Sequence, residues 1–292
     1  MPAEFKTIGI IGKFANVKIQ EQIHTMSEYL ENKGLQILLD QGTAEALQIN
    51  NIDSLPRAGL GEESDLIIVL GGDGTLLNAA RSLVKYEIPI IGVNLGRLGF
   101  LTDILWDEFQ QKLDEIFAGD FQQDERLMLD VEIIRGGVSL SQSIAFNEVV
   151  VHKWEEARML EFETYIDGGF VNTQRSDGLI ISTPTGSTAY ALSGGGPIME
   201  PSLHVISLVP ICPHTLSQRP LMIRGDSEVV ISISESGHAR AQVTCDGQIN
   251  MGVNAGDNIH IKGYEKRITL LHPEEYNYFE ILRTKLHWGE KL

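Results

Sequence analysis

The sequence is poor in cysteine and in basic residues, and each shortage excludes a class of protein. Only two cysteines, Cys212 and Cys245, occur among 292 residues. They form no Cys-X-X-Cys motif or Cys/His cluster, so a zinc site is not expected, and so low a number fits a reducing compartment. Lysine and arginine total 23 against 40 acidic residues, which gives a formal net charge of −17. Nucleic-acid binders and membrane-surface proteins need a basic face, so both classes are disfavoured.

Long apolar segments are missing as well. No apolar run approaches the roughly 20 residues of a membrane span. The N-terminal segment lacks the basic start and long apolar stretch of a signal peptide. We therefore expect a cytoplasmic protein whose acidity serves mainly solubility. If its ligands are anionic, they must be attracted by local features such as helix N-termini, a metal ion or a few placed arginines and lysines.

Several catalytic motifs of other enzyme classes are absent. The chain contains no GxSxG elbow, no HExxH, no GxxxxGK[ST] loop, and no GxGxxG after its first strand-like run. The histidines are scattered, and we expect structural roles for them: His152, His204, His214 and His272. Both cysteines fall in apolar β-type runs and are expected in the core.

The first third of the chain alternates strand and helix patterns. Apolar runs predict strands at 7–12, 35–39, 66–70 and 88–93, and amphipathic spacing predicts helices at 18–33, 75–86 and 106–117. Gly34 and Gly119 follow two of these helices as C-terminal stops. The alternation predicts an α/β domain with a doubly wound parallel sheet over residues 1–122. At roughly 150 residues per domain, the length allows a second one.

The pattern changes after residue 122. Many short β-type runs, separated by Gly, Asp, Asn and Ser, fill residues 123–272, and helical periodicity is scarce. This texture predicts an all-β, sandwich-like second domain. The segment 274–288 can form a helix, and such a helix can pack back on the first domain.

A glycine-rich turn follows the apolar run 66–70. Gly71, Gly72 and Gly74 let the backbone turn sharply and approach a ligand. The following helix would point free N–H groups and its positive dipole end at the turn, which suits phosphate. A tight strand-to-helix turn without a ligand is the alternative. Asp73 favours the functional interpretation, because a carboxylate there repels phosphate unless it holds a metal or orients a substrate hydroxyl.

Two further segments carry polar residues at strand ends. Residues 90–102 repeat the strand-to-glycine-turn pattern, and since parallel strands end at one edge of a sheet, this loop should lie near the first turn. Structural and ligand-contacting roles are equally open there. In residues 145–151, Asn147 and Glu148 are neighbours inside a strand-like run. Alternation would expose only one of them, so the other needs a partner or a ligand. A strand end or bulge is the alternative.

The longest polar block spans residues 175–197 and reads RSDGLIISTPTGSTAYALSGGGP. It offers hydroxyls and backbone N–H groups for phosphates, and Tyr190 could stack on a base. Its length and density favour a binding role. The Asp246-Gly247 pair further on is typical of a hairpin turn.

Together these motifs resemble the NAD kinase family. The resemblance runs in order through most of the chain: GGDG at 71–74, NLGRLGFLT at 94–102, NE at 147–148, the block at 175–197, and DGQ at 246–248. GGDG alone also occurs in diacylglycerol-type lipid kinases and in phosphofructokinases, whereas the 175–197 block is specific.

The resemblance implies transfer of the γ-phosphoryl of ATP to the 2′-hydroxyl of the adenosine ribose of NAD, a divalent cation such as magnesium, and a homo-oligomer, dimer or tetramer. It implies that Asp73 accepts the proton of the reacting hydroxyl and that Gly74 lies beside it. NAD would contact Asn147, Glu148, Arg158, Arg175, Asp177, Thr188, Ala189, Tyr190, Ala191, Leu192, Ser193 and Gln248. An arginine at position 175 goes with preference for NAD over NADH in the family. Metal ligands cannot be assigned.

Elementary chemistry limits the role of Asp73. A carboxylate is a far weaker base than an alkoxide, so it cannot deprotonate the ribose hydroxyl beforehand. It can orient the hydroxyl and accept the proton late in the transfer. Arg97, Arg158 and Arg175 are candidates to neutralise the anionic substrates. Two alternatives are a lipid or sugar kinase, which the 175–197 block disfavours, and a non-catalytic NAD sensor, which the presence of Asp73 disfavours.

Overall fold

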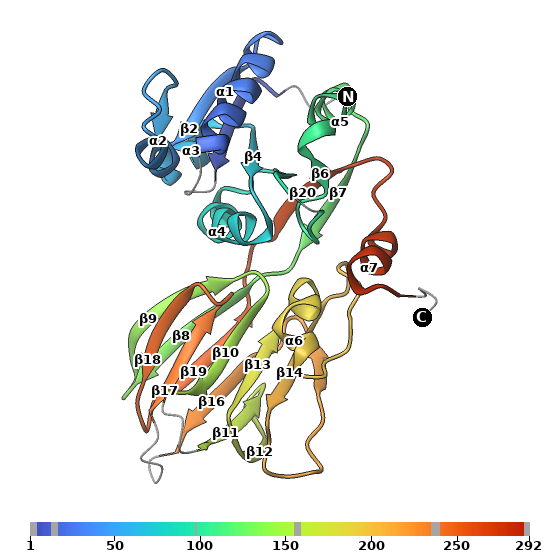
Figure 1. The fold of residues 1–292 in the computed structure, drawn as a ribbon. Helices are drawn as coiled ribbons and strands as arrows, with labels where there is room; N and C mark the ends of the chain where they lie inside the picture. The colour runs from blue at the N-terminus through green and yellow to red at the C-terminus, as the bar shows by residue number, and fades with distance from the viewer. Residues whose placement is uncertain (1–4, 13–16, 97, 155–158, 235–239, 289–292) are drawn as a thin grey trace. The chain divides into compact units, whose positions relative to one another are not determined.

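The computed structural model describes residues 5–12, 17–96, 98–154, 159–234 and 240–288. The chain divides into two compact units (Figure 1). The first comprises Met1–Glu125 with Ile268–Leu292, and the second comprises Arg126–Arg267. Within the described ranges, no helix has both the length and the apolar character needed to cross a bilayer.

The first unit is built on a sheet of order β3-β2-β1-β4-β5-β20-β7, with β6 paired to β5. Its strands are β1 (Thr7–Gly12), β2 (Gln36–Asp40), β3 (Ser54–Leu55), β4 (Leu66–Leu70), β5 (Ile90–Asn94), β6 (Ile104–Leu105), β7 (Phe121–Arg126) and β20 (Ile268–Pro273). Its α-helices are α1 (Val17–Glu31), α2 (Gln41–Leu47), α3 (Arg57–Glu63), α4 (Asp73–Leu83), α5 (Phe109–Ala118) and α7 (Tyr278–Leu286). Neighbouring strands from β3 to β20 pair in parallel, which confirms the predicted α/β class.

The strand order fixes where this sheet can bind a ligand. β1 and β4 are neighbours, and the chain runs outward from them in opposite directions, to β2 and β3 on one side and to β5 on the other. In open parallel sheets, ligands bind beyond the carboxyl ends of the strands at such a reversal point. The glycine turn at 71–74 directly follows β4 and lies at that place.

Two elements of the first unit differ from the sequence prediction. The last strand, β20, was expected in the β-rich domain, but it pairs in parallel with β5 through Leu270 and Ile90. The helix expected from residue 75 begins at Asp73 and ends at Leu83, followed by a 3-10 turn at Val84–Tyr86. Its earlier start makes Asp73 the first helical residue and Gly72 the N-cap.

The second unit consists of two six-stranded antiparallel sheets, of orders β15-β14-β13-β10-β17-β18 and β12-β11-β16-β19-β8-β9. Their strands are β8 (Leu129–Arg135), β9 (Val138–Ala145), β10 (Glu148–Lys153), β11 (Leu160–Ile166), β12 (Gly169–Ser176), β13 (Gly178–Ser182), β14 (Val205–Ile211), β15 (Leu221–Arg224), β16 (Val229–Ile233), β17 (Ala241–Cys245), β18 (Ile249–Val253) and β19 (Asn258–Gly263). The predicted sandwich-like domain is confirmed.

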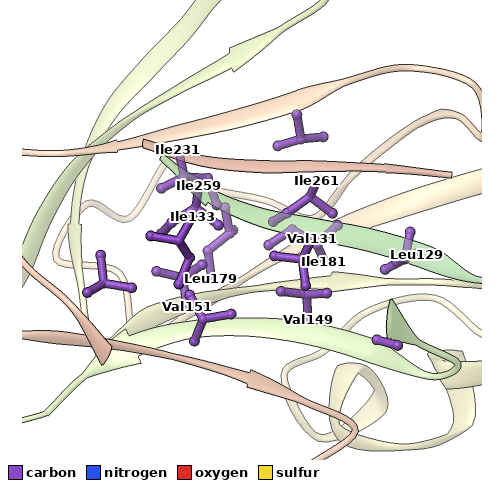
Figure 2. Close-up of a cluster of buried hydrophobic side chains, with 14 of the residues drawn as sticks. Leu129, Val131, Ile133, Val149, Val151, Leu179, Ile181, Ile231, Ile259 and Ile261 are labelled. Carbon is purple, nitrogen blue, oxygen red and sulfur yellow. The ribbon is translucent and has the colours of Figure 1, made fainter. Parts of the chain in front are cut away.

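The core of the sandwich comes from alternating side chains of both sheets. Val131 and Ile133 of β8 meet Val149 and Val151 of β10 in one buried cluster (Figure 2). Val150, between the last two, points to the opposite face of its sheet and packs with Ala191 in a second small cluster. The short helix α6 (Tyr190–Ser193), which carries Ala191, therefore covers that outer face.

One of the two cysteines was placed wrongly by sequence reasoning. Cys245 is buried in the sandwich core, as expected. Cys212 is exposed and has a positive φ of 44°. It follows the last residue of β14, where the strand ends in a turn, so its side chain leaves the apolar run to which the sequence assigned it.

Candidate active site

The glycine turn is formed by the packing of β4 against the start of α4. All five residues of β4 are buried, so the strand is fixed up to Leu70. A Cβ on Gly71 would lie 2.5 Å from Thr75 Oγ1 and 2.9 Å from its Cβ, which only glycine avoids. Gly72 has open space around the position of a Cβ and makes no side-chain cap to the helix. Thr75 N and Leu76 N donate to the carbonyl oxygen of Gly72, so α4 begins at this uncovered glycine, and the positive end of its dipole favours an anion there.

The carboxylate of Asp73 is held by the loop that follows β5. Its Oδ2 accepts a hydrogen bond from Phe100 N at 2.9 Å. Its Oδ1 accepts three, from Leu101 N at 3.0 Å, Thr102 N at 3.2 Å and Thr102 Oγ1 at 3.1 Å. We refer to residues 98–102 as the clamp loop. Because a carboxylate oxygen can accept about two hydrogen bonds, Oδ2 retains capacity for a further donor such as a substrate hydroxyl.

The clamp loop itself depends on glycine and on one buried amide. A Cβ on Gly99 would lie 2.1 Å from Asp73 Oδ1, so the close approach requires glycine. Asn94, buried at the end of β5, donates from Nδ2 to Thr102 Oγ1 at 2.7 Å. The expectation that the loops after β4 and β5 lie together is thus confirmed. Sequence reasoning did not identify the N–H donors to Asp73, since backbone amides carry no signal in side-chain identity.

Glu148 begins strand β10 in the second unit, Asn147 directly precedes the strand, and a second aspartate fixes both. Asp246 accepts backbone hydrogen bonds from Phe146 (3.0 and 3.1 Å), Asn147 (2.7 Å) and Glu148 (3.2 Å). It sits in the β17–β18 turn with a φ of 50°, followed by Gly247 at 62°. The predicted hairpin turn is present, and its aspartate has the additional function of anchoring the 146–148 backbone.

Glu148 is a buried acid with an unusual protonation state. Only 6% of its surface is exposed, and its Oε2 has no hydrogen-bond partner among the described residues. Burial, and next the negative charge of Asp246, raise the pKa of Glu148 to about 8. At neutral pH its carboxyl group is therefore mainly protonated and can donate a hydrogen bond. Asn147 is only partly buried and lies just before β10, so the pair sits at a strand end, which was the alternative to alternation inside a strand.

The 183–188 turn is fastened to the same backbone. Thr183 Oγ1 lies 2.7 Å from the carbonyl oxygen of Phe146, and Thr183 N donates to Asn147 O at 2.9 Å. A Cβ on Gly186 would lie 2.2 Å from Asn147 O, so this contact requires glycine. Arg126, 2% exposed, donates from Nη1 to Thr185 Oγ1 at 3.2 Å. No sequence pattern marks Arg126, because a lone arginine before an apolar run is normally solvated.

The rest of the predicted 188–193 segment follows directly. Thr188 ends a 3-10 turn (Thr185–Thr188), and Tyr190 begins α6 after Ala189. Tyr190 is 47% exposed, which leaves its ring available for stacking, whereas Ala191 is buried. Leu192 and Ser193 complete α6. Gln248 is exposed in the β17–β18 turn, two residues after Asp246, and so belongs to the same end of the sandwich as Asn147.

Two predicted residues lie elsewhere within this chain. Asp177 pairs with Lys153 at 2.7 Å. In the β10–β13 register Glu148 faces Ser182, and His152 faces Gly178, so Asp177 is about five residues along the strands from Glu148. At about 3.4 Å per residue this is roughly 17 Å. Arg175 is exposed on β12 and pairs with Glu161 at 3.5 Å. The structure therefore does not bring these two residues to Asn147 within one chain.

Arg97 and Arg158 lie outside the described residues. Among the residues that are described, no group of three or more His, Cys, Asp or Glu side chains is arranged to hold a metal ion.

Comparison with known proteins gives a consistent result. The ATP-NAD kinase N-terminal domain matches residues 8–121, and the ATP-NAD kinase C-terminal domain matches residues 146–272. The NAD kinase of Chromohalobacter salexigens is 47% identical over 288 residues, or 99% of this chain and 98% of the relative. The NAD kinase of Azotobacter vinelandii is 45% identical with the same coverage.

Solved structures agree. An NAD kinase from Archaeoglobus fulgidus in complex with ATP is 25% identical, with a TM-score of 0.74 over 96% of this chain and 98% of that one. A yeast NADH kinase complexed with NADH, 24% identical, shares the fold with a TM-score of 0.89 over 99% of this chain and 89% of that one.

Proposed function

The chain belongs to the NAD kinase family, and on that basis we propose how its residues carry out the family's phosphoryl transfer. The chain is a phosphotransferase that moves the γ-phosphoryl group of ATP to the 2′-hydroxyl of the adenosine ribose of NAD and makes NADP. The observation that supports our assignment of roles is Asp73, fixed by four donors at the start of α4 with Oδ2 still able to accept a hydrogen bond.

In the proposed mechanism, Asp73 Oδ2 accepts the hydrogen bond of the 2′-hydroxyl and so points the hydroxyl oxygen at the γ-phosphorus. Phosphoryl transfer passes through a loose transition state, so positioning and neutralisation of charge account for most of the rate. The proton moves to Oδ2 late, when charge has left the hydroxyl oxygen. In the proposed phosphate loop, Gly71 lets the backbone pack closely against Thr75, and the open Gly72 and exposed Gly74 leave room for phosphate oxygens beside the first turn of α4.

Asn147 and Glu148 are the proposed contacts to NAD in the second unit. Because the Glu148 carboxyl is mainly neutral at pH 7, it can donate one hydrogen bond and accept another without adding negative charge next to an anionic dinucleotide. Tyr190 is the proposed stacking surface, and Thr188, Ala189, Ala191, Leu192, Ser193 and Gln248 are the further proposed contacts. Asp177, Arg158 and Arg175 remain proposed NAD ligands. A planar guanidinium group can form two parallel hydrogen bonds with a phosphate, which supports Arg158 and Arg175 as NAD ligands.

Magnesium is proposed to arrive with ATP as part of the substrate. Mg²⁺ usually keeps several waters and binds through substrate phosphates and one or two carboxylates, so it needs no all-protein cage. The lack of a metal-ligand cluster in the described part of the chain fits such a substrate-borne ion. A homo-oligomer and a cytoplasmic location are proposed from family likeness and from the low cysteine content.

The test is formation of NADP from NAD and MgATP, compared with binding of NAD by calorimetry. We expect Asp73→Asn to lower kcat by roughly 10²- to 10⁴-fold while NAD still binds. Asp65→Asn is the matched control, because Asp65 also accepts two backbone N–H groups in the same unit but precedes β4 instead of following it. Near-normal turnover of Asp73→Asn would remove Asp73 from the mechanism. NAD binding without any NADP from the unaltered chain would favour a sensor.

A further inference from the structure

The C-terminal segment of the chain contacts the clamp loop at its first residue and directly after its last one. Lys285, on α7, donates from Nζ to the carbonyl oxygen of Leu98 at 2.5 Å. The same ammonium group lies 5.8 Å from the centre of the Phe100 ring. Leu98 is the first residue of the loop, and Phe100 supplies the N–H donor to Asp73 Oδ2. One cation thus touches both the start of the loop and the residue that contacts the proposed reactive oxygen.

The other end of the loop is fastened by His272, at the end of β20. His272 Nδ1 lies 2.9 Å from Oδ2 of Asp103, the residue directly after Thr102. Both side chains are buried, at 1% and 7% exposure. The imidazole ring is held in place by stacking on Tyr276, with ring centres 3.8 Å apart and planes within 11°. The position of Asp103 is therefore set by a residue almost 170 positions later in the sequence.

The two halves of the loop differ in how they are held. Leu101 and Thr102 are buried, at 3% and 0% exposure, so packing fixes the second half. The start of the loop borders a pocket of about 180 Å³, which is lined by Leu98, Asp103 and Lys112 together with Tyr276 and Ile281 of the C-terminal segment. Leu98 lacks close contacts on the side of this pocket, and the backbone of the adjacent Gly99 has many accessible conformations. The contact with Lys285 is then what restricts the start of the loop, and the contact between His272 and Asp103 adds to the packing of its end.

We propose that Lys285 and His272 are positioning residues: they hold the clamp loop so that its amides present Asp73 Oδ2 to the acceptor hydroxyl. The proposal rests on the proposed function of Asp73. A displacement of about 1 Å of a reacting group can cost roughly 100-fold in rate, so the contacts of Lys285 and His272 affect kcat without either residue touching substrate.

Lys285→Met tests the first contact, because it keeps most of the aliphatic stem and removes the ammonium group. We expect faster hydrogen exchange at the amides of Phe100, Leu101 and Thr102, and a kcat lower by roughly tenfold with little change in KM for NAD. Lys285→Arg, which keeps a donor, should restore most of both values. The matched control is Lys112→Met: Lys112 lines the same cavity but bonds Glu115 and Glu275 instead of the loop.

The outcomes separate positioning from general stabilisation. If Lys285→Met and Lys112→Met lower kcat equally and in proportion to their melting temperatures, the contact is merely structural and the proposal is overturned. Unchanged amide exchange at 100–102, or faster exchange with normal kcat, also overturns it. His272→Phe is the second variant: it keeps a ring to stack on Tyr276 but removes Nδ1, and with it Nε2, which lies 3.7 Å from Asp124 Oδ2. It should give the same pattern of amide exchange and kcat as Lys285→Met.

A double-variant cycle distinguishes this proposal from the proposed function. If Lys285 acts through Asp73, Lys285→Met should lower kcat much less in the Asp73→Asn background than in the unaltered chain. Full additivity would mean that Lys285 acts by another route and would overturn the proposal. An active Asp73→Asn variant would instead defeat the proposed role of Asp73, while the amide-exchange result would still report whether Lys285 fixes the loop.

Discussion

Replacing Glu148 by glutamine should stabilise the protein, and increasingly so as pH rises from about 5 to 8. The side chain is buried, and Asp246 lies beside it, so the pKa of its carboxyl group rises from the ordinary 4.5 to about 8. A carboxyl group whose pKa is higher in the folded state costs no stability at pH values below its pKa in the unfolded chain. Above it the unfolded chain releases the proton and the folded chain does not, so stability falls as pH rises and levels off above the folded pKa.

The size of the effect follows from the same two values. Each pH unit between 4.5 and 8 costs about 1.4 kcal/mol, which reaches roughly 3 kcal/mol at pH 7 and roughly 5 kcal/mol above pH 8. Glutamine has nearly the shape of the neutral acid and does not titrate, so the variant avoids this cost. For a chain of this size, 3 kcal/mol corresponds to a rise in melting temperature of roughly 6 °C at pH 7.

The assay is urea unfolding of both proteins at half-unit pH steps from 4.5 to 8.5. The free-energy difference between Glu148→Gln and the unaltered chain should grow across this window and then stay constant. Glu132→Gln is the control, because hydrogen bonds from Ser139 and Gln142 lower the pKa of Glu132. Removing this carboxylate should therefore not stabilise the protein at any pH in the window. If the difference in free energy of unfolding between Glu148→Gln and the unaltered chain does not change with pH, the reasoning is refuted.

Two further predictions concern the anchors of Asn147. Gly186→Ala places a Cβ 2.2 Å from Asn147 O, and it should raise KM for NAD at least roughly tenfold in steady-state assays. The control is Gly252→Ala, which has open space around it and should leave KM unchanged. Equal KM values for the two variants would contradict the contact assigned to Asn147. Asp246→Ala leaves three buried or partly buried amides without their acceptor, at about 1–3 kcal/mol each. Urea unfolding should therefore show a loss of at least about 3 kcal/mol, and a smaller loss would contradict the anchoring role of Asp246.

The sequence predicts those features that depend on local pattern. Apolar runs indicate β4 and β5, and a run ending in three glycines around an acid predicts the turn that holds Asp73. Because parallel strands end at one edge, the nearness of the β4 and β5 loops also follows. Alternation does not apply to the 147–148 pair, because the strand begins only at Glu148, and the burial of Glu148 becomes visible only in the structure.

Features that depend on long-range contacts are not predictable in this way. The amides of Phe100–Thr102 that fix Asp73 come from backbone, which every residue carries. The anchoring by Asp246 joins positions about 100 residues apart, and an Asp-Gly pair looks the same in any hairpin. β20 has the apolar pattern of a sandwich strand, so its membership of the first sheet becomes visible only through its pairing with Ile90.

The placement of β20 has a consequence for synthesis on the ribosome. β5 is complete at residue 94, but the strand that pairs with its other edge ends at residue 273. At roughly 5–20 residues per second, translation of the intervening chain takes about 10–35 s. Throughout that time only β6 covers that edge of β5, at Val93 and Asn94, and the part around Ile90 stays unpaired, which is a template for wrong pairing. A nascent chain of this protein thus has to shield that edge until its last strand emerges, and the second unit can finish folding before the first.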